Sequence, residues 1–196
     1  MIAIASLLAA SVVAAAPTTP LPWYTFEDYP MKAFEQEWKG AATFELLVDP
    51  AGRPTACTVT RSTGYAVLDR QTCFIAMHRA RFTPARGPDG TAAFGVYRSM
   101  VKWHRPDQDS LQAEPGPDIA VKVAALPAGT RQPAAVKVAF FVDAAGAASS
   151  CTPLAESKAQ PAALVDAACN QVLARPSPGA SSRPTVRTAA ILFTAD

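Results

Sequence analysis

Hydrophobic and polar residues alternate in two stretches of the chain, which is the pattern of a β-strand with one buried face. In residues 43–49 every second residue from Phe44 to Val48 is apolar, and the same holds from Val136 to Val142. Each stretch runs into an aspartate that a glycine follows three residues later, which is typical of a tight turn. Both stretches are therefore predicted to open a β-hairpin, and the first hairpin returns over residues 55–61.

Residues 66–79 have the apolar spacing of a helix. Leu68, Cys73 and Ile75 share one arc, and polar residues lie opposite. This arc predicts that the helix packs on the sheet that the first hairpin begins. The other predicted elements are helices over residues 31–38 and 161–173, and strands over residues 93–103, 119–126 and 185–194. The first half thus has the order helix, strand, strand, helix, strand, which indicates an α+β fold.

The two hairpins and the helices that follow them form an internal repeat with a period of about 94 residues. All four cysteines fall at equivalent points of the repeat. Cys57 and Cys151 lie in the returning strands, whereas Cys73 and Cys169 lie in the helices. A period of this length indicates duplication of a small domain.

We therefore predict two tandem antiparallel-sheet domains, over residues 17–103 and residues 119–196. A polar, proline-containing stretch at residues 104–118 is the predicted linker. The second copy is degenerate, because it lacks the first helix and carries Pro153 within its returning strand.

Residues 2–16 form an unbroken run of small and aliphatic residues. The run is shorter than the roughly 20 residues that a membrane-spanning helix needs, and Val13-Ala14-Ala15 supplies a cleavage site before Ala16. Residues 1–16 are therefore predicted to be a cleaved signal peptide. No lysine or arginine precedes the run, so an uncleaved membrane anchor is the alternative.

Export changes the expectation for the cysteines, because an oxidising compartment favours disulfides. Four cysteines allow three pairings, and the repeat favours Cys57 with Cys73 and Cys151 with Cys169. A disulfide that closes a loop of about 15 residues contributes roughly 3 kcal/mol in the chain-entropy model. The alternative is that the thiols are buried and unpaired.

Composition and motifs give no support for catalysis. The formal net charge is +2 without a cluster of lysine and arginine, so neither nucleic acid nor an anionic membrane is an expected partner. Both histidines, His78 and His104, are predicted to lie at the surface. The chain lacks a Cys-x-x-Cys motif, a nucleophile elbow and a phosphate-binding glycine loop. We expect no catalytic residue, no metal site, no cofactor and no small-molecule substrate.

Residues 29–103 resemble the C-terminal domain of TonB, the periplasmic part of the energy transducer of Gram-negative bacteria. The resemblance rests on a series of short motifs in this order: Tyr29-Pro30, Val48-Asp49-x-x-Gly52-Arg53, Ser62-Thr63-Gly64 with Leu68-Asp69, Arg81-Phe82-x-Pro84-Ala85, and Gly90. It implies a small antiparallel sheet with a helix across one face. The second copy retains only the hairpin, the start of the helix and the strand pattern.

The resemblance also implies a partner, namely an extended periplasmic segment of an outer-membrane transporter that adds to a sheet edge as a strand. The end of the corresponding strand is the predicted partner-binding site: Tyr97, Arg98, Ser99, Met100, Val101, Lys102 and Trp103. The alternative is that the second copy covers this strand and leaves no edge.

Two departures from the TonB pattern bear on function. The cysteine pairs are not part of the general family pattern, and only about a dozen residues, a reach of roughly 40 Å, separate the apolar run from Tyr29. The predicted function is therefore a protein- or peptide-binding module exported to the periplasm, with a segment of an outer-membrane transporter or another envelope protein as its partner. The alternatives are an inner-membrane-anchored transducer for TonB-dependent transport and a structural envelope protein without peptide binding.

Overall fold

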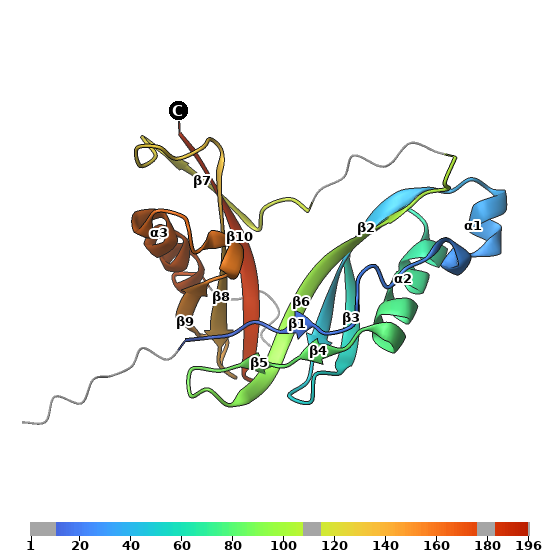
Figure 1. Ribbon diagram of the computed structural model, residues 1–196, viewed down its shortest axis with the longest axis horizontal. Coiled ribbons are helices and arrows are strands. Elements are labelled where there is room, and N and C mark those ends of the chain that lie inside the picture. Colours follow the sequence, from blue (N-terminus) through green and yellow to red (C-terminus); the bar gives the residue numbers. More distant parts are fainter. Residues whose placement is uncertain (1–10, 108–114, 176–182, 196) are drawn as a thin grey trace, which may run out of the picture.

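The computed structural model describes residues 11–107, 115–175 and 183–195. Its main feature is one mixed eight-stranded sheet with the order β3-β2-β6-β10-β8-β9, in which β5 also pairs with β6 and β7 with β10 (Figure 1). A two-stranded sheet joins β1 to β4. The large sheet has two halves that meet at β6 and β10, and each half carries its own helix on one face (Figure 1). We call residues 11–107 the first half and residues 115–195 the second half.

The first half is built on β2 (Gly40–Val48), β3 (Pro54–Arg61) and β6 (Ala92–Trp103), with α2 (Ala66–Arg79) packed against β2 and β3. The predicted apolar arc of α2 faces the sheet, since Leu68 and Ile75 are buried. The short elements of this half are β1 (Ala16–Pro17), η1 (Phe26–Asp28), α1 (Met31–Glu35), β4 (Phe82–Thr83) and β5 (Ala85–Arg86).

The second half repeats the order hairpin, helix, strand. Its elements are β7 (Ile119–Val123), β8 (Ala134–Val142), β9 (Ala148–Pro153), η2 (Ala155–Ser157), α3 (Ala162–Leu173) and β10 (Thr185–Ala195). α3 packs against β8 and β9. β7, which has no counterpart in the first half, lies parallel to β10 from Ile191 onward.

The turns of the two hairpins are alike. The Oδ1 atom of Asp49 accepts two backbone N–H groups of its turn, each at 2.9 Å, and Oδ1 of Asp143 does the same at the same distances. Gly52 and Gly146 follow at φ 78° and φ 86°, a conformation that glycine adopts without steric cost. The repeated motif therefore forms the same local structure twice, whereas the duplication itself stays a prediction.

The two halves share a sheet, and the division into two tandem domains stays a prediction. β6 and β10 pair in parallel at Phe94–Gly95 and Thr185–Val186. Val186 and Ala139 of the second half belong to the buried cluster of the first half. The sequence does not predict this ladder, because only two residues of β6 pair with two residues of β10. The predicted linker falls partly outside the described residues, at 108–114, and stays a prediction.

α1 is shorter than the predicted helix over residues 31–38. Glu37 adopts a left-handed conformation (φ 53°), and Trp38 donates its N–H to the carbonyl of Ala33 at 2.9 Å, which ends the helix. Gly40, two residues after Trp38, begins β2. A Cβ on Gly40 would lie 2.5 Å from the carbonyl oxygen of Thr63, so a glycine is needed there.

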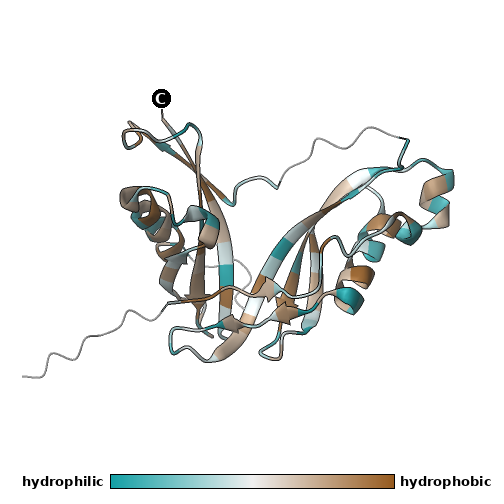
Figure 2. Cartoon of the chain, viewed as in Figure 1, coloured by the Kyte–Doolittle hydropathy of each residue, from teal (hydrophilic) through white to brown (hydrophobic). Residues whose placement is uncertain are grey.

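Apolar residues are concentrated in the strands of both halves and in α3 (Figure 2). Among the described residues no helix has the length and hydropathy to cross a membrane. The predicted signal peptide falls partly outside the described residues, at 1–10. Its remaining residues lie against the first half, where Val12 and Ala15 are buried. Cleavage before Ala16 stays a prediction.

Candidate functional site

The neighbours of β6 change along its length. On one side it pairs with β2 without a break, from Gly95 to Trp103. On the other side β10 pairs only with Phe94 and Gly95, and the two strands then diverge (Figure 1). Within the described part of the chain, no strand pairs with residues 96–101 on that side. We call this side of residues 96–101 the β6 edge.

The register shows which backbone groups point toward the β6 edge. Asp49 donates its N–H to Arg53 across the first turn, and the carbonyl of Thr43 accepts the Thr60 hydroxyl, so odd-numbered residues of β2 face β3. Even-numbered residues of β2 therefore face β6, because backbone groups alternate in direction along a strand.

These even-numbered residues lie opposite odd-numbered residues of β6, as in the pairs Ala42–Val101 and Phe44–Ser99. The odd-numbered residues of β6 thus exchange hydrogen bonds with β2. Arg98 and Met100 direct their backbone N–H and C=O groups toward the β6 edge. A row of such groups is a template for an added strand.

The side chains of the predicted partner-binding residues divide between two faces. Val101 and Trp103 are buried on the face under α2, where Trp103 Nε1 donates to the Thr72 hydroxyl at 2.9 Å. Tyr97, on the same face, packs against Trp23 and Phe82. Residues 98, 100 and 102 are half-buried on the opposite face. The core thus holds β6 rigidly and determines which of its sides is open.

One ion pair crosses from the β6 edge to the second half. Arg98 pairs with Asp118, whose Oδ2 accepts the N–H of Ala190 in β10 at 2.8 Å. Asp118 also donates its own N–H to the carbonyl of Ala190 at 2.8 Å. Sequence reasoning missed Asp118, because it lies in the stretch predicted to be a linker and follows no motif.

The structure contains both disulfides that the repeat favours. Cys57–Cys73 joins β3 to α2, and Cys151–Cys169 joins β9 to α3. Each links a hairpin to the helix across it, and neither lies at the β6 edge. We infer that their role is structural.

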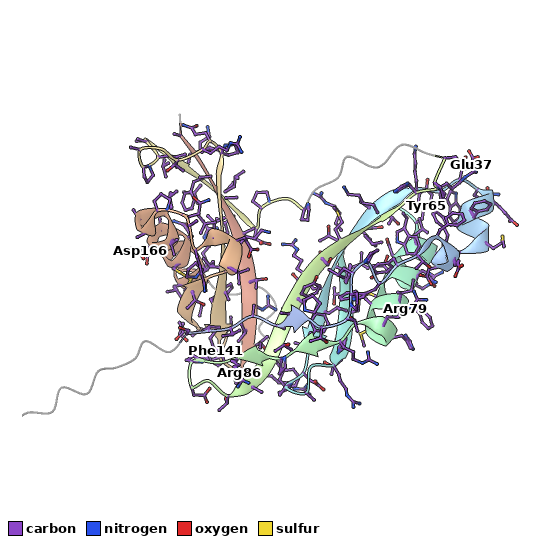
Figure 3. All side chains as sticks on the ribbon, in the orientation of Figure 1. Glu37, Tyr65, Arg79, Arg86, Phe141 and Asp166 are labelled. Atoms are coloured by element: carbon purple, nitrogen blue, oxygen red, sulfur yellow. A yellow bond between two sulfur atoms is a disulfide. The ribbon has the colours of Figure 1, made fainter. Side chains whose placement is uncertain are left out.

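The titratable groups with displaced pKa values also have structural causes. Burial raises the pKa of the Tyr24 hydroxyl, which donates to the carbonyl of Thr72 at 3.0 Å. The hydrogen bonds from the guanidinium of Arg79, labelled in Figure 3, lower the pKa of Asp28. In the described residues no group of three or more histidines, cysteines and carboxylates is placed to bind a metal.

A hollow of about 510 Å³ lies at the base of the two halves, between Pro50, Phe94, Phe141 and Pro184. Its lining carries one carboxylate, Asp89, which accepts the N–H and the hydroxyl of Thr91 at 3.0 and 2.7 Å. The described lining of the hollow therefore presents no pair of convergent catalytic groups.

Comparison with known proteins identifies one family. Residues 27–94 match the model of the family described as Gram-negative bacterial TonB protein C-terminal. No curated protein and no solved structure matches the chain. The match confirms the family predicted from the sequence motifs. It ends at Phe94, near the start of β6, so both the β6 edge and the second half lie beyond it.

Proposed function

Residues 27–94 form a domain of the TonB C-terminal family, and from this premise we propose that the chain binds an extended peptide segment at the β6 edge. Domains of this family are non-enzymatic interaction domains of the envelope that contact outer-membrane transporters. Membership of this family indicates a TonB-like role in transport at the cell envelope. The strand-addition mode and the site are the proposal.

The main support for the proposal is that β6 diverges from β10 after Gly95. Arg98 and Met100 present backbone donors and acceptors on a strand that β2 and the α2 core hold in place. Main-chain hydrogen bonds to these groups supply affinity in strand addition, and side chains at alternate positions supply specificity.

The proposed partner is a periplasmic segment of an outer-membrane transporter. The proposed location is the periplasm, with the apolar run of residues 2–16 directing export. A transducer needs an extended tether to transmit force. Residues 12–17 instead lie along the domain, with Val12 and Ala15 buried, which favours a binding module over a transducer.

The proposal is tested by a proline at the β6 edge. Met100→Pro removes an N–H that points away from β2, and Met100→Ala, the matched control, shortens the same half-buried side chain and keeps that N–H. The ligands are synthetic peptides covering the N-terminal periplasmic segments of outer-membrane transporters from the same genome, titrated by calorimetry. We expect wild type and Met100→Ala to bind one or more of these peptides, and Met100→Pro to lose at least tenfold in affinity.

Two results would overturn the proposal. Equal binding by Met100→Pro and Met100→Ala would place the peptide elsewhere on the molecule. Failure of the folded wild-type protein to bind any peptide of the set would favour a structural envelope protein without peptide binding.

A further inference from the structure

Residues 12–19 run beside β4 and β5 as an additional antiparallel strand. Val13 and Arg86 exchange both backbone hydrogen bonds, with N···O distances of 3.0 and 2.9 Å. Farther along, β1 pairs with β4, and Thr18 donates its N–H to the carbonyl of Arg81 at 2.7 Å. Repeated main-chain bonds of this kind are the mark of strand addition.

The side chains of this segment are unevenly buried, and Ala14 between the two buried residues is half-buried. Val12 and Ala15 are 4% and 8% exposed, whereas Val13 is 48% exposed, and Ala16 is exposed as well. Ala15 packs directly on the backbone of Gly95, since a Cβ built on Gly95 would lie 3.1 Å from the Cβ of Ala15. The position beside Gly95 therefore admits only a small side chain.

The segment contacts both halves of the molecule. The carbonyl of Val12 accepts the hydroxyl of Thr152 in β9 at 2.7 Å. Val12 also belongs to the buried cluster that includes Val186 of β10. Gly87, the residue after Arg86, lies close to Phe141 of the second half, since a Cβ built on Gly87 would lie 3.5 Å from the Phe141 ring. The segment thus covers the junction that the short β6–β10 ladder forms.

We propose that β4, β5 and Gly95 form a second strand-binding site, distinct from the β6 edge, whose occupant is the chain's own residues 12–17. The folded protein keeps this segment. The site takes an extended apolar stretch with a small side chain opposite Gly95 and an aliphatic side chain at the junction of the halves. The prediction from the sequence differs, because cleavage before Ala16 would remove Val12, Val13 and Ala15.

The sequence prediction and the structure differ because small and aliphatic residues suit both a signal peptide and a strand bound at this site. An unbroken run of them fits the apolar region of a signal peptide. The same residues fit a shallow strand site with one glycine at its floor, because their side chains need little depth. Only the burial of particular side chains, such as Val12 and Ala15, separates the two roles, and a run in which every residue is apolar does not reveal which side chains are buried.

Two leucine substitutions test the site directly. Ala15→Leu places three extra carbons against Gly95, whereas Ala16→Leu adds the same carbons one residue later on the exposed side. Both variants are compared in the full-length chain, made by cell-free synthesis under disulfide-forming conditions so that export plays no part. We expect Ala15→Leu to lower the melting temperature by roughly 5 °C or more, and Ala16→Leu to leave it within about 1 °C.

Two further measurements use the wild-type protein. The amide of Arg86 should exchange slowly with deuterium, because it donates to Val13. The intact mass of the natively exported protein should include residues 12–17. An exported chain that begins after Val12, or equal melting temperatures for the two leucine variants, would overturn the proposal.

Discussion

The two halves contain the same hairpin, turn and disulfide, yet their last strands have different surroundings. β10 pairs with β8 over its length from Thr185 to Phe193, and β7 covers its other side from Ile191 onward. β6 pairs with β2 in the same way, but its other side loses β10 after Gly95. β7 has no counterpart in the first half. One added strand therefore covers the last part of β10, from Ile191 onward, whereas no described strand pairs with residues 96–101 of β6 on that side.

This difference fits the proposal that the first half carries the binding edge. In the second half β7 covers part of a sheet edge, and a covered edge is protected against unwanted pairing. The first half holds its open edge rigid through the buried Val101 and Trp103. The family match covers residues 27–94, so both the β6 edge and the second half lie beyond it.

Proline substitutions are expected to give the largest difference in stability between the last strands of the two halves. Met100 and Leu192 are both half-buried, but Leu192 lies between β8 and β7, so its N–H faces a neighbouring strand in either direction. We expect Leu192→Pro to lower the free energy of unfolding by about 3 kcal/mol or more, and Met100→Pro by about 1 kcal/mol. Urea titration measures both. Equal losses would mean that the β6 edge is paired in solution.

Removal of each disulfide tests what the halves share. The separations of the paired cysteines are nearly equal, 16 residues for Cys57–Cys73 and 18 for Cys151–Cys169. Double cysteine-to-alanine variants should therefore each lose about 3 kcal/mol of unfolding free energy in the chain-entropy model. A loss confined to one half would show that the other disulfide closes a loop that is already ordered in the unfolded chain.

The sequence patterns predicted these shared features well. The alternation from Phe44 to Val48 and the helical arc around Leu68 depend on neighbouring residues alone, so they can be read from a single stretch of chain. The cysteine pairing followed from the repeat. What separates the halves was not predictable, because it depends on contacts between distant residues, such as the two-residue ladder at Gly95 and the ion pair of Arg98 with Asp118.

The candidate site could be predicted only in part, because its open side also depends on contacts between distant residues. The resemblance to a family pointed to the strand that ends at Trp103, but not to the side of it that stays open. That side follows from the register of β2 against β6, which shows that Met100 and Arg98 direct their backbone groups outward. The burial of Val101 likewise needs the position of α2.

The first turns of α2 and α3 are expected to differ less in what they contribute to the free energy of unfolding. Asp69 in the first turn of α2 accepts hydrogen bonds from the N–H and hydroxyl of Thr63 at 2.9 and 2.8 Å, and from the Ser62 hydroxyl. Asp166 in α3 is exposed. Asp69→Ala should lower the free energy of unfolding by about 1–2 kcal/mol, and Asp166→Ala by less than about 0.5 kcal/mol. Equal effects in thermal unfolding would mean that the Asp69 bonds do not persist in water.

The smallest expected difference between the halves is a dependence on pH. Asp28 receives two hydrogen bonds of 2.6 Å from Arg79, which hold its pKa below the ordinary value in the folded protein. The folded state therefore binds the Asp28 proton less readily than the unfolded state does. The stabilisation from this pair is present above the ordinary pKa of aspartate, about 3.9, and is lost as the pH falls through the lower folded value.

Asp28→Asn should therefore reduce the urea midpoint at pH 7 and flatten its decline between about pH 5 and pH 2. The matched control in the second half is Glu156→Gln. Glu156 lies 3.5 Å from Lys137, and both side chains are more than half exposed, so water and salt screen the pair. Glu156→Gln should leave the pH profile unchanged. An unchanged profile in Asp28→Asn would show that the Arg79 pair is broken in solution, so that η1 is held to α2 without it, for example by the hydrogen bond from Gln71 to the carbonyl of Asp28.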